Sequence, residues 1–347
     1  MESTMRRVCS SSVQMPCQSH TEAEAWSAKA QGKKGDCLAV GYTPLLLEKV
    51  STDLEQNDLS QLEEIWKKIK ESGKQRFIRK YGQIATLIQV KIEEPLIRAA
   101  LQLWDPSHRC FTFNKKDLTP TIEEYSTLLQ IDLQCPDKIY VRKTNLGFRK
   151  KLAKIMKIKS ELIDPHTKEK GGSRGIEWDF LRRFIMEHLH DDQGLDAFAL
   201  AIYGLIIFPR MTGYIEVAVV DFFEQVQNNC NPSPAILAET FRSLNFCRRN
   251  TESRFVGCLP MLYIWLRSHL PCKKSAFVKP YLPNSLPIEE FCNSEWSGPM
   301  TKEQWVSFLG KISNEPLIWL APWMLPVPIL YRCGDELWVP LPGSWGQ

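Results

Sequence analysis

Four side chains in one stretch of the sequence have types and spacing suited to acid–base chemistry or metal binding. They lie between residues 96 and 131 and are Asp105, His108, Glu123 and Glu124. Carboxylates and an imidazole that meet in a pocket could exchange protons or hold a cation. Capping explains the acids without such a site, because Asp105 precedes a helix-stopping proline and both glutamates fall in the next helix's first turn. We favour capping, with Thr119 as the expected N-cap.

Two other segments resemble ligand sites but lack the required spacing. Residues 188–192, HLHDD, end an expected helix at 176–190. Side chains two apart on a helix point in nearly opposite directions, so His188 and His190 would not share an ion. The glycine-rich segment at 168–175, KEKGGSRG, lacks the GxxxxGK[ST] spacing of a phosphate-binding loop. We predict no metal site in the first segment and an ordinary loop in the second.

The most basic stretch of the chain runs from residue 141 to 159 and contains no acid. Its apolar side chains fall on one face of a predicted helix at 143–159, and are Phe148, Leu152, Ile155 and Met156. The basic residues could contact phosphates, act as a nuclear import signal, or form a solvated helix face. The candidate nucleic-acid contacts are Arg149, Lys150, Lys151, Lys154 and Lys157. Exposed aromatic residues for stacking single-stranded bases are not interleaved with them.

Composition and charge indicate an ordinary globular protein. The chain has 347 residues, 44% of them hydrophobic and 24% charged, enough for one large or two medium domains. A net charge of +4 permits contact with nucleic acid but does not require it. No two of the eleven cysteines lie within four positions, which excludes a CxxC half-site. The odd number of cysteines in a long chain fits reduced, buried thiols in a cytosolic or nuclear protein.

The domain organisation follows from where hydrophobic periodicity begins. Residues 1–40 are rich in Ser, Ala, Gln and Lys and show no sustained period, so we predict a disordered N-terminal segment. Residues 41–347 read as one helical domain. Its longest apolar run, residues 197–208, is shorter than the ~20 residues of a membrane-spanning helix. We therefore predict no membrane span, and the first residues contain no signal-peptide core.

The fold class predicted from periodicity is mainly α: a multi-helix globular domain with short β-hairpins. Helices are expected at 57–73, 81–90, 95–105, 119–129, 143–159, 176–190, 195–208, 216–227, 233–249, 257–270 and 301–309. A strand is expected at 110–113, a surface connection at 279–299 and a hairpin at 329–341. Gly204 is expected to allow a close approach between helices. Pro260 either begins its helix or kinks it.

Five segments carry a family resemblance. They are FTFNKKDLT at 111–119, FALAIYGLIIFPR at 198–210, PAILAETFRSLNFCRR at 234–249, GCLPMLYIWLRSHL at 257–270, and the last, at 319–346, which begins WLAPWMLPVP. In order and spacing they resemble the plant mobile domain family, in particular its plant-specific branch of uncharacterised domains from cotton and relatives. The resemblance covers residues 40–347. Pro260 stands where the family has a helix former, and the family's chains continue past Trp345-Gly346, which predicts a C-terminal truncation.

The resemblance implies a role but no reaction. Family members are carried by plant transposable elements or derived host genes, and some are linked to element silencing and meristem maintenance in the nucleus. An "aminotransferase-like" label attaches to some, but no lysine here has a credible cofactor-binding setting, and no catalytic residues can be carried over. We therefore expect a non-enzymatic helical interaction domain in the nucleus or cytoplasm, with unknown protein partners and no cofactor, membrane or small-molecule substrate. The alternatives are a nucleic-acid-binding protein, an uncharacterised enzyme and a degenerate gene product.

Overall fold

The part of the chain that the structure describes belongs to one unit. This computed structural model describes residues 51–114, 116–131, 140, 147–170, 172–250, 252–270, 286–294, 300–312, 317–318 and 320–324. All of them fall within the unit Pro44–Val327, whereas a second unit, Met1–Thr43 with Pro328–Gln347, lies outside the described residues. The predicted disordered segment at 1–40 and the predicted hairpin at 329–341 also lie outside them.

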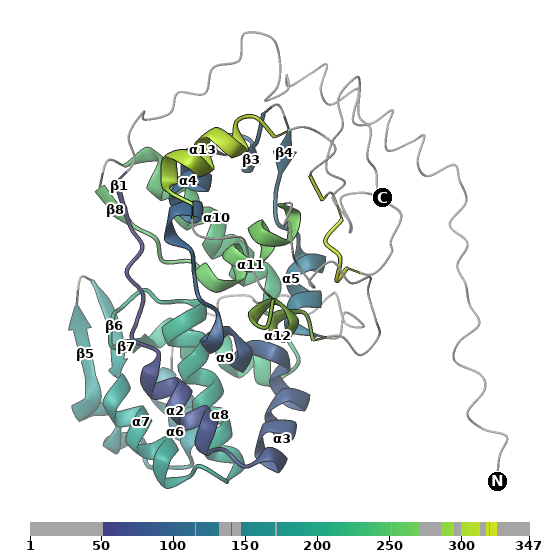
Figure 1. Ribbon diagram of the computed structural model, residues 1–347. Coiled ribbons are helices and arrows are strands. Elements are labelled where there is room, and N and C mark those ends of the chain that lie inside the picture. The colour runs from purple at the N-terminus through teal and green to yellow at the C-terminus, as the bar shows by residue number, and fades with distance from the viewer. Residues whose placement is uncertain are drawn as a thin grey trace, which may run out of the picture. The chain divides into compact units, whose positions relative to one another are not determined.

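The described chain is mainly α-helical, which confirms the predicted fold class (Figure 1). The α-helices are α2 (Ser60–Lys68), α3 (Glu71–Tyr81), α4 (Glu94–Gln102), α5 (Ile122–Leu129), α6 (Phe148–Met156), α7 (Trp178–Glu187), α8 (Asp192–Ile202), α9 (Val217–Gln227), α10 (Ser233–Arg249), α11 (Leu259–His269), α12 (Pro287–Cys292) and α13 (Lys302–Leu309). Shorter segments of 3-10 helix are η1 (Gly82–Gln89), η2 (Ser160–Leu162) and η3 (Asp164–His166), and η4 (Tyr203–Ile207) is a π-helix.

The strands are short and form small separate sheets. They are β1 (Ser51–Asp53), β2 (Trp104–Asp105), β3 (Cys110–Thr112), β4 (Asp117–Leu118), β5 (Thr167–Lys170), β6 (Ser173–Glu177), β7 (Tyr214–Glu216) and β8 (Glu252–Arg254). β1 pairs in parallel with β8, with Ser51 opposite Glu252. The other two sheets are antiparallel, in the orders β2-β3-β4 and β5-β6-β7. None of the described sheets has more than three strands, so helix packing forms the core.

The core is centred on two helices that are buried on all sides. From Ala197 onward every residue of α8 is buried, and so is every residue of α11. Helices that are apolar all round must lie inside a protein or a membrane. Among the described helices, none combines the length and the hydropathy that crossing a bilayer requires. Phe198 of α8 packs against Phe77 and stacks on Trp66, with ring centroids 5.6 and 5.9 Å apart, so α8 holds α2 and α3 against the core.

Gly204 allows a close approach, but to a strand rather than to a helix. A Cβ added at Gly204 would lie 2.7 Å from Cγ1 and Cγ2 of Ile215 in β7. The prediction of a close approach at Gly204 is correct, but the predicted partner, another helix, is wrong, because the neighbour is strand β7. The sequence pattern missed β7 because a three-residue strand carries too few residues for a period to show.

Replacing Gly204 with alanine is expected to lower the free energy of unfolding by about 1–3 kcal/mol, because the new methyl overpacks the contact with Ile215. Urea denaturation measures the change. The control is Gly147→Ala, whose added methyl would meet nothing within 4 Å. Equal losses at the two positions would show that the close approach is not the cause.

Two helix termini differ from the prediction. The helix at 95–105 ends at Gln102, because Trp104 and Asp105 pair with Phe111 and Cys110 in the β2–β3 ladder. The next helix is capped by Thr121 rather than Thr119. The Thr121 hydroxyl accepts from the Glu124 amide at 3.2 Å, and the Glu124 carboxylate accepts from the Thr121 amide at 3.0 Å. This reciprocal pair is a capping box, which satisfies two amides at once.

Other differences involve glycine, proline and short helices, including the predicted helix at 81–90, which is the 3-10 helix η1. Gly73 lies inside α3 and does not end a helix. Its lack of a side chain allows close packing, because a Cβ there would lie 2.9 Å from Ile69 Cγ2. The predicted loop at 168–175 is the β5–β6 hairpin, where Gly172 has φ +73°, suited to a tight turn. Pro260 stands in the first turn of α11, so the helix begins there. Helix α12 lies within the predicted connection at 279–299.

Candidate functional site

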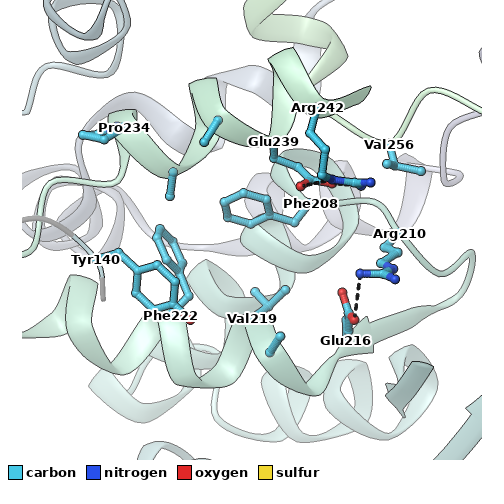
Figure 2. Close-up of a pocket in the computed structure, with 13 residues that line it drawn as sticks. Tyr140, Phe208, Arg210, Glu216, Val219, Phe222, Pro234, Glu239, Arg242 and Val256 are labelled. Carbon is cyan, nitrogen blue, oxygen red and sulfur yellow. Dashed lines mark hydrogen bonds and ion pairs between the residues drawn. The ribbon is translucent and has the colours of Figure 1, made fainter. Parts of the chain in front are cut away.

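A groove on the described surface lies between α9 and α10 and has a volume of about 490 Å³ (Figure 2). We call it the α9–α10 groove. Its apolar lining includes Phe208, Val219, Phe222, Pro234, Ala235 and Ala238. The short side chains of α10 leave the space open, and the side chains of α9 form the floor. The volume falls in the range typical of binding sites.

Aromatic packing fixes one end of the groove. The buried ring of Phe222 meets Tyr140 and Phe208 edge to face, each with centroids 5.1 Å apart. Tyr203, from the buried π-helix η4, meets the same ring edge to face at 5.6 Å. Edge-to-face contacts orient aromatic rings relative to one another. The floor is therefore held in shape by rings from separate parts of the chain.

Two arginine–glutamate pairs form the other end of the groove (Figure 2). Arg242 Nε donates to Glu239 Oε2 at 2.8 Å, and its Nη2 donates to the second carboxylate oxygen. Arg210 Nη1 lies 3.5 Å from Glu216 Oε1. The hydrogen bonds that Arg242 donates to Glu239 raise the pKa of Arg242, and the charge of Glu216 adds to the effect. The arginine side chains stay 53% and 52% exposed, so guanidinium N–H groups face solvent beside an apolar floor.

The predicted basic helix is confirmed as an amphipathic helix, but it is shorter than expected. Residues 141–146 lie outside the described chain, and α6 covers Phe148–Met156 with the four predicted apolar side chains buried. It ends before Lys159 because Lys157 adopts a left-handed conformation with φ +52°. The left-handed residue closes the helix, so the basic run does not form one continuous helical face.

The five candidate nucleic-acid contacts divide into two groups. Lys151 is 16% exposed and its ammonium binds the buried Asp221 carboxylate, with Glu224 at 2.8 Å. Arg149 pairs with Asp164 on η3. Lys150, Lys154 and Lys157 are exposed, and no hydrogen bond or ion pair joins them to any residue that the structure describes. Lys151 is therefore part of the packed interior, and three lysines remain available to a phosphate.

The candidate acid–base residues do not meet in one site, because Asp105 and Glu124 each contact a different histidine. Asp105 is buried, and its Oδ2 lies 2.9 Å from Nδ1 of His108. Glu124 is also buried, and its Oε1 lies 3.0 Å from Nε2 of His269. Burial raises the pKa of the Glu123 carboxyl. Glu124 caps α5, which confirms capping for that acid, and Oδ1 of Asp105 likewise accepts from nearby backbone amides.

The histidines at 188–192 do not converge either. His188 Nδ1 lies 3.3 Å from Asp191 Oδ2 and 2.7 Å from Gln193 Nε2, whereas His190 is exposed. Within the described ranges, no group of three or more His, Cys, Asp or Glu side chains is placed to hold a metal ion.

Sequence reasoning missed the groove, although one signal for it was present. The apolar period of α10 predicts a buried stripe of Ile236, Leu237, Phe241 and Leu244. The structure buries all of them except Phe241, which is half-buried. Ala235, Ala238 and Phe246 are also apolar but fall off that stripe. Apolar residues on the face opposite a buried stripe indicate a surface that another molecule can cover.

Comparison with known proteins identifies one family whose model matches most of the chain. The model of a family described as a domain of unknown function, DUF7745, matches residues 62–347. No match is found among curated proteins, and none among solved structures. The matched range contains α6, both helices of the groove and the Glu124–His269 pair.

Proposed function

The chain belongs to the family of the domain of unknown function DUF7745, and from this premise we propose that it is a non-enzymatic protein-interaction domain. Its α9–α10 groove receives an apolar segment of a partner protein. The observation that carries this proposal is a groove of about 490 Å³ with an apolar lining, a fixed aromatic end and two half-exposed arginines. Covering apolar surface contributes roughly 25 cal/mol per Å² to association before its entropic costs.

Filling the groove is expected to weaken partner binding at least tenfold. The change is Ala238→Trp, at an exposed position of α10, so the indole occupies the groove with a folding cost of less than about 1 kcal/mol. The measurement is retention of 16-residue peptides, selected from a displayed random library on the wild-type chain. The matched control is Lys154→Trp, at an exposed position of α6 outside the groove. Peptides that bind Ala238→Trp as tightly as the wild type would refute the groove as the binding site.

Nucleic acid is the second candidate partner, because one specific observation favours it. Lys150 and Lys154 stand one turn apart on the exposed side of α6, and exposed Lys157 follows at its end. Contact with phosphate would use these three lysines, since Lys151 and Arg149 already have carboxylate partners.

If the chain binds duplex DNA through α6, replacing Lys150, Lys154 and Lys157 with glutamine is expected to reduce the slope of log K against log salt by about 2.7, because each phosphate contact contributes about 0.9. Fluorescence anisotropy across a salt series measures the slope. The control replaces Lys67 and Lys68, which pair with Glu63 and Glu64 on α2. An unchanged slope in the triple variant would remove α6 from nucleic-acid binding.

We also propose a relationship to the plant mobile domain, a transposable-element origin and a nuclear site of action. The support for these is the sequence resemblance of the five segments. Imaging of a fluorescent fusion of the full chain tests the location, and exclusion of the fusion from nuclei would contradict it.

A further inference from the structure

One exposed face of α10 continues the α9–α10 groove along the helix. Ala235, Ala238, Arg242, Phe246 and Arg249 are three or four positions apart, so they share this face. The last four of them are exposed. At 1.5 Å per residue the face is about 21 Å long, or about four turns. The groove therefore forms only the first half of a longer surface.

Phe246 is the apolar centre of the second half. It is 49% exposed, and Leu162 is the other large hydrophobic residue that the described surface exposes. Two arginines flank it on the same face, Arg242 one turn before it and Arg249 one turn after it. Aromatic residues and arginine are both enriched at protein–protein interfaces, so this ring and its flanking arginines fit a binding surface.

The charge of this surface favours an acidic partner. Glu239 occupies two N–H groups of Arg242, which leaves the rest of that fork to an external acceptor. Within the described part of the chain, the ion pair of Arg210 is the one with Glu216, at 3.5 Å. Arg249 is exposed and makes no hydrogen bond or ion pair with any residue in the described part of the chain. The arginines on this surface therefore offer more donors than the two glutamates accept.

We infer that this face of α10 binds an acidic amphipathic helix of a partner protein. The inference deepens the proposed function and rests on it. A helix of about 14 residues matches the 21 Å length. Its apolar side chains, spaced i, i+3 or i+4 and i+7, fill the groove and cover Phe246. Glutamate or aspartate beside them accepts hydrogen bonds from Arg242 and Arg249, which are bidentate donors to carboxylates.

A displayed peptide library tests the preference for an acidic partner separately from binding of the peptide to this face of α10. Each 16-residue peptide has leucine fixed at the i, i+3, i+4 and i+7 positions, and glutamate, glutamine or lysine at the flanking positions. On the wild-type chain we expect enrichment of glutamate. On an Arg242→Gln, Arg249→Gln variant the glutamate preference is expected to disappear. On Phe246→Ser we expect retention to fall at least tenfold.

Controls and outcomes distinguish the two levels of the proposal. Arg79→Gln removes an exposed arginine of α3 and should leave the preference intact. Circular dichroism and urea unfolding check that each variant folds. If peptides lose binding in Ala238→Trp and yet show no preference for glutamate, the result would refute an acidic partner but would still support the proposal of an interaction domain. Failure of every peptide to bind, or equal binding to Ala238→Trp, would overturn both. If the wild-type chain forms a dimer and Phe246→Ser does not, this face binds a second copy of the chain. That result would refute the proposal of an acidic helical partner.

Discussion

Replacing Lys151 with alanine is expected to lower the free energy of unfolding by about 3–5 kcal/mol, because it leaves a buried carboxylate without its cation. The Asp221 side chain is fully buried, and Lys151 Nζ binds it while lying 2.8 Å from Glu224 Oε2. The Tyr140 hydroxyl also donates to Asp221 Oδ2, at 3.3 Å, but a neutral donor does not replace the lost charge. Urea denaturation monitored by circular dichroism measures the effect.

The neighbouring Lys150→Ala supplies the matched control, since Lys150 is exposed and its loss should change stability by less than about 0.5 kcal/mol. Equal effects at the two positions would contradict the buried pair. Burial lowers the pKa of Lys151, but hydrogen bonds to Asp221 and Glu224 outweigh it and raise the pKa above the ordinary lysine value. The stabilisation is therefore complete below the unfolded pKa of about 10.4, and is lost only as pH rises through the higher folded value.

Replacing His269 with leucine is expected to lower the free energy of unfolding by about 3–5 kcal/mol as well, because Oε1 of the buried Glu124 carboxylate loses its histidine partner and the Ile318 carbonyl loses its donor. His269 Nε2 lies 3.0 Å from Glu124 Oε1, and His269 Nδ1 lies 2.7 Å from the Ile318 carbonyl oxygen. A carbonyl cannot donate, so Nδ1 carries a hydrogen. Glu124 Oε2 also accepts from the Trp265 indole at 2.8 Å, so the carboxylate joins α5 to α11.

The same substitution should also release the segment around Ile318. Besides the side-chain contact, the Ile318 amide donates to the His269 carbonyl at 3.1 Å, and Trp323 Nε1 donates to Ser268 Oγ at 2.9 Å. Hydrogen–deuterium exchange is expected to accelerate at Ile318 more than in α8. His190→Leu, at an exposed position, is the control. Unchanged exchange at Ile318 together with full stability would contradict the anchoring role.

Local signals predicted much of the fold. Helix periodicity identified α8, α10 and α11, because their buried stripes are long enough for the period to dominate. The helix predicted at 301–309 corresponds to α13, whose start is fixed by a capping box between Thr301 and Gln304. Helix ends were less predictable where strand pairing competed with the helix. Trp104 continues the apolar stripe of α4 in sequence, yet it pairs with Phe111 in β3.

The buried polar pairs could not be predicted, because each joins residues far apart in the sequence. Lys151 and Asp221 are separated by 70 positions, and Glu124 and His269 by 145. Helical phase puts Lys151 beside the apolar stripe and Lys150 away from it, but no local pattern indicates that Asp221 is the partner of Lys151. The α9–α10 groove has the same origin, because its shape depends on how two helices lie beside each other rather than on either helix alone.

The parallel pairing of β1 with β8 constrains how the chain can fold during synthesis. Ser51 leaves the ribosome long before its partner Glu252, and in the folded chain Arg98 also donates to the Thr52 carbonyl, at 2.6 Å. About 200 residues separate the two strands, which at roughly 5–20 residues per second is a delay of about 10–40 s. The elements from α2 to α10 emerge before β8, so β1 can pair with β8 only after most of the described helices have been made. A nascent chain stalled before residue 252 should therefore hold β1 open to proteases and chaperones.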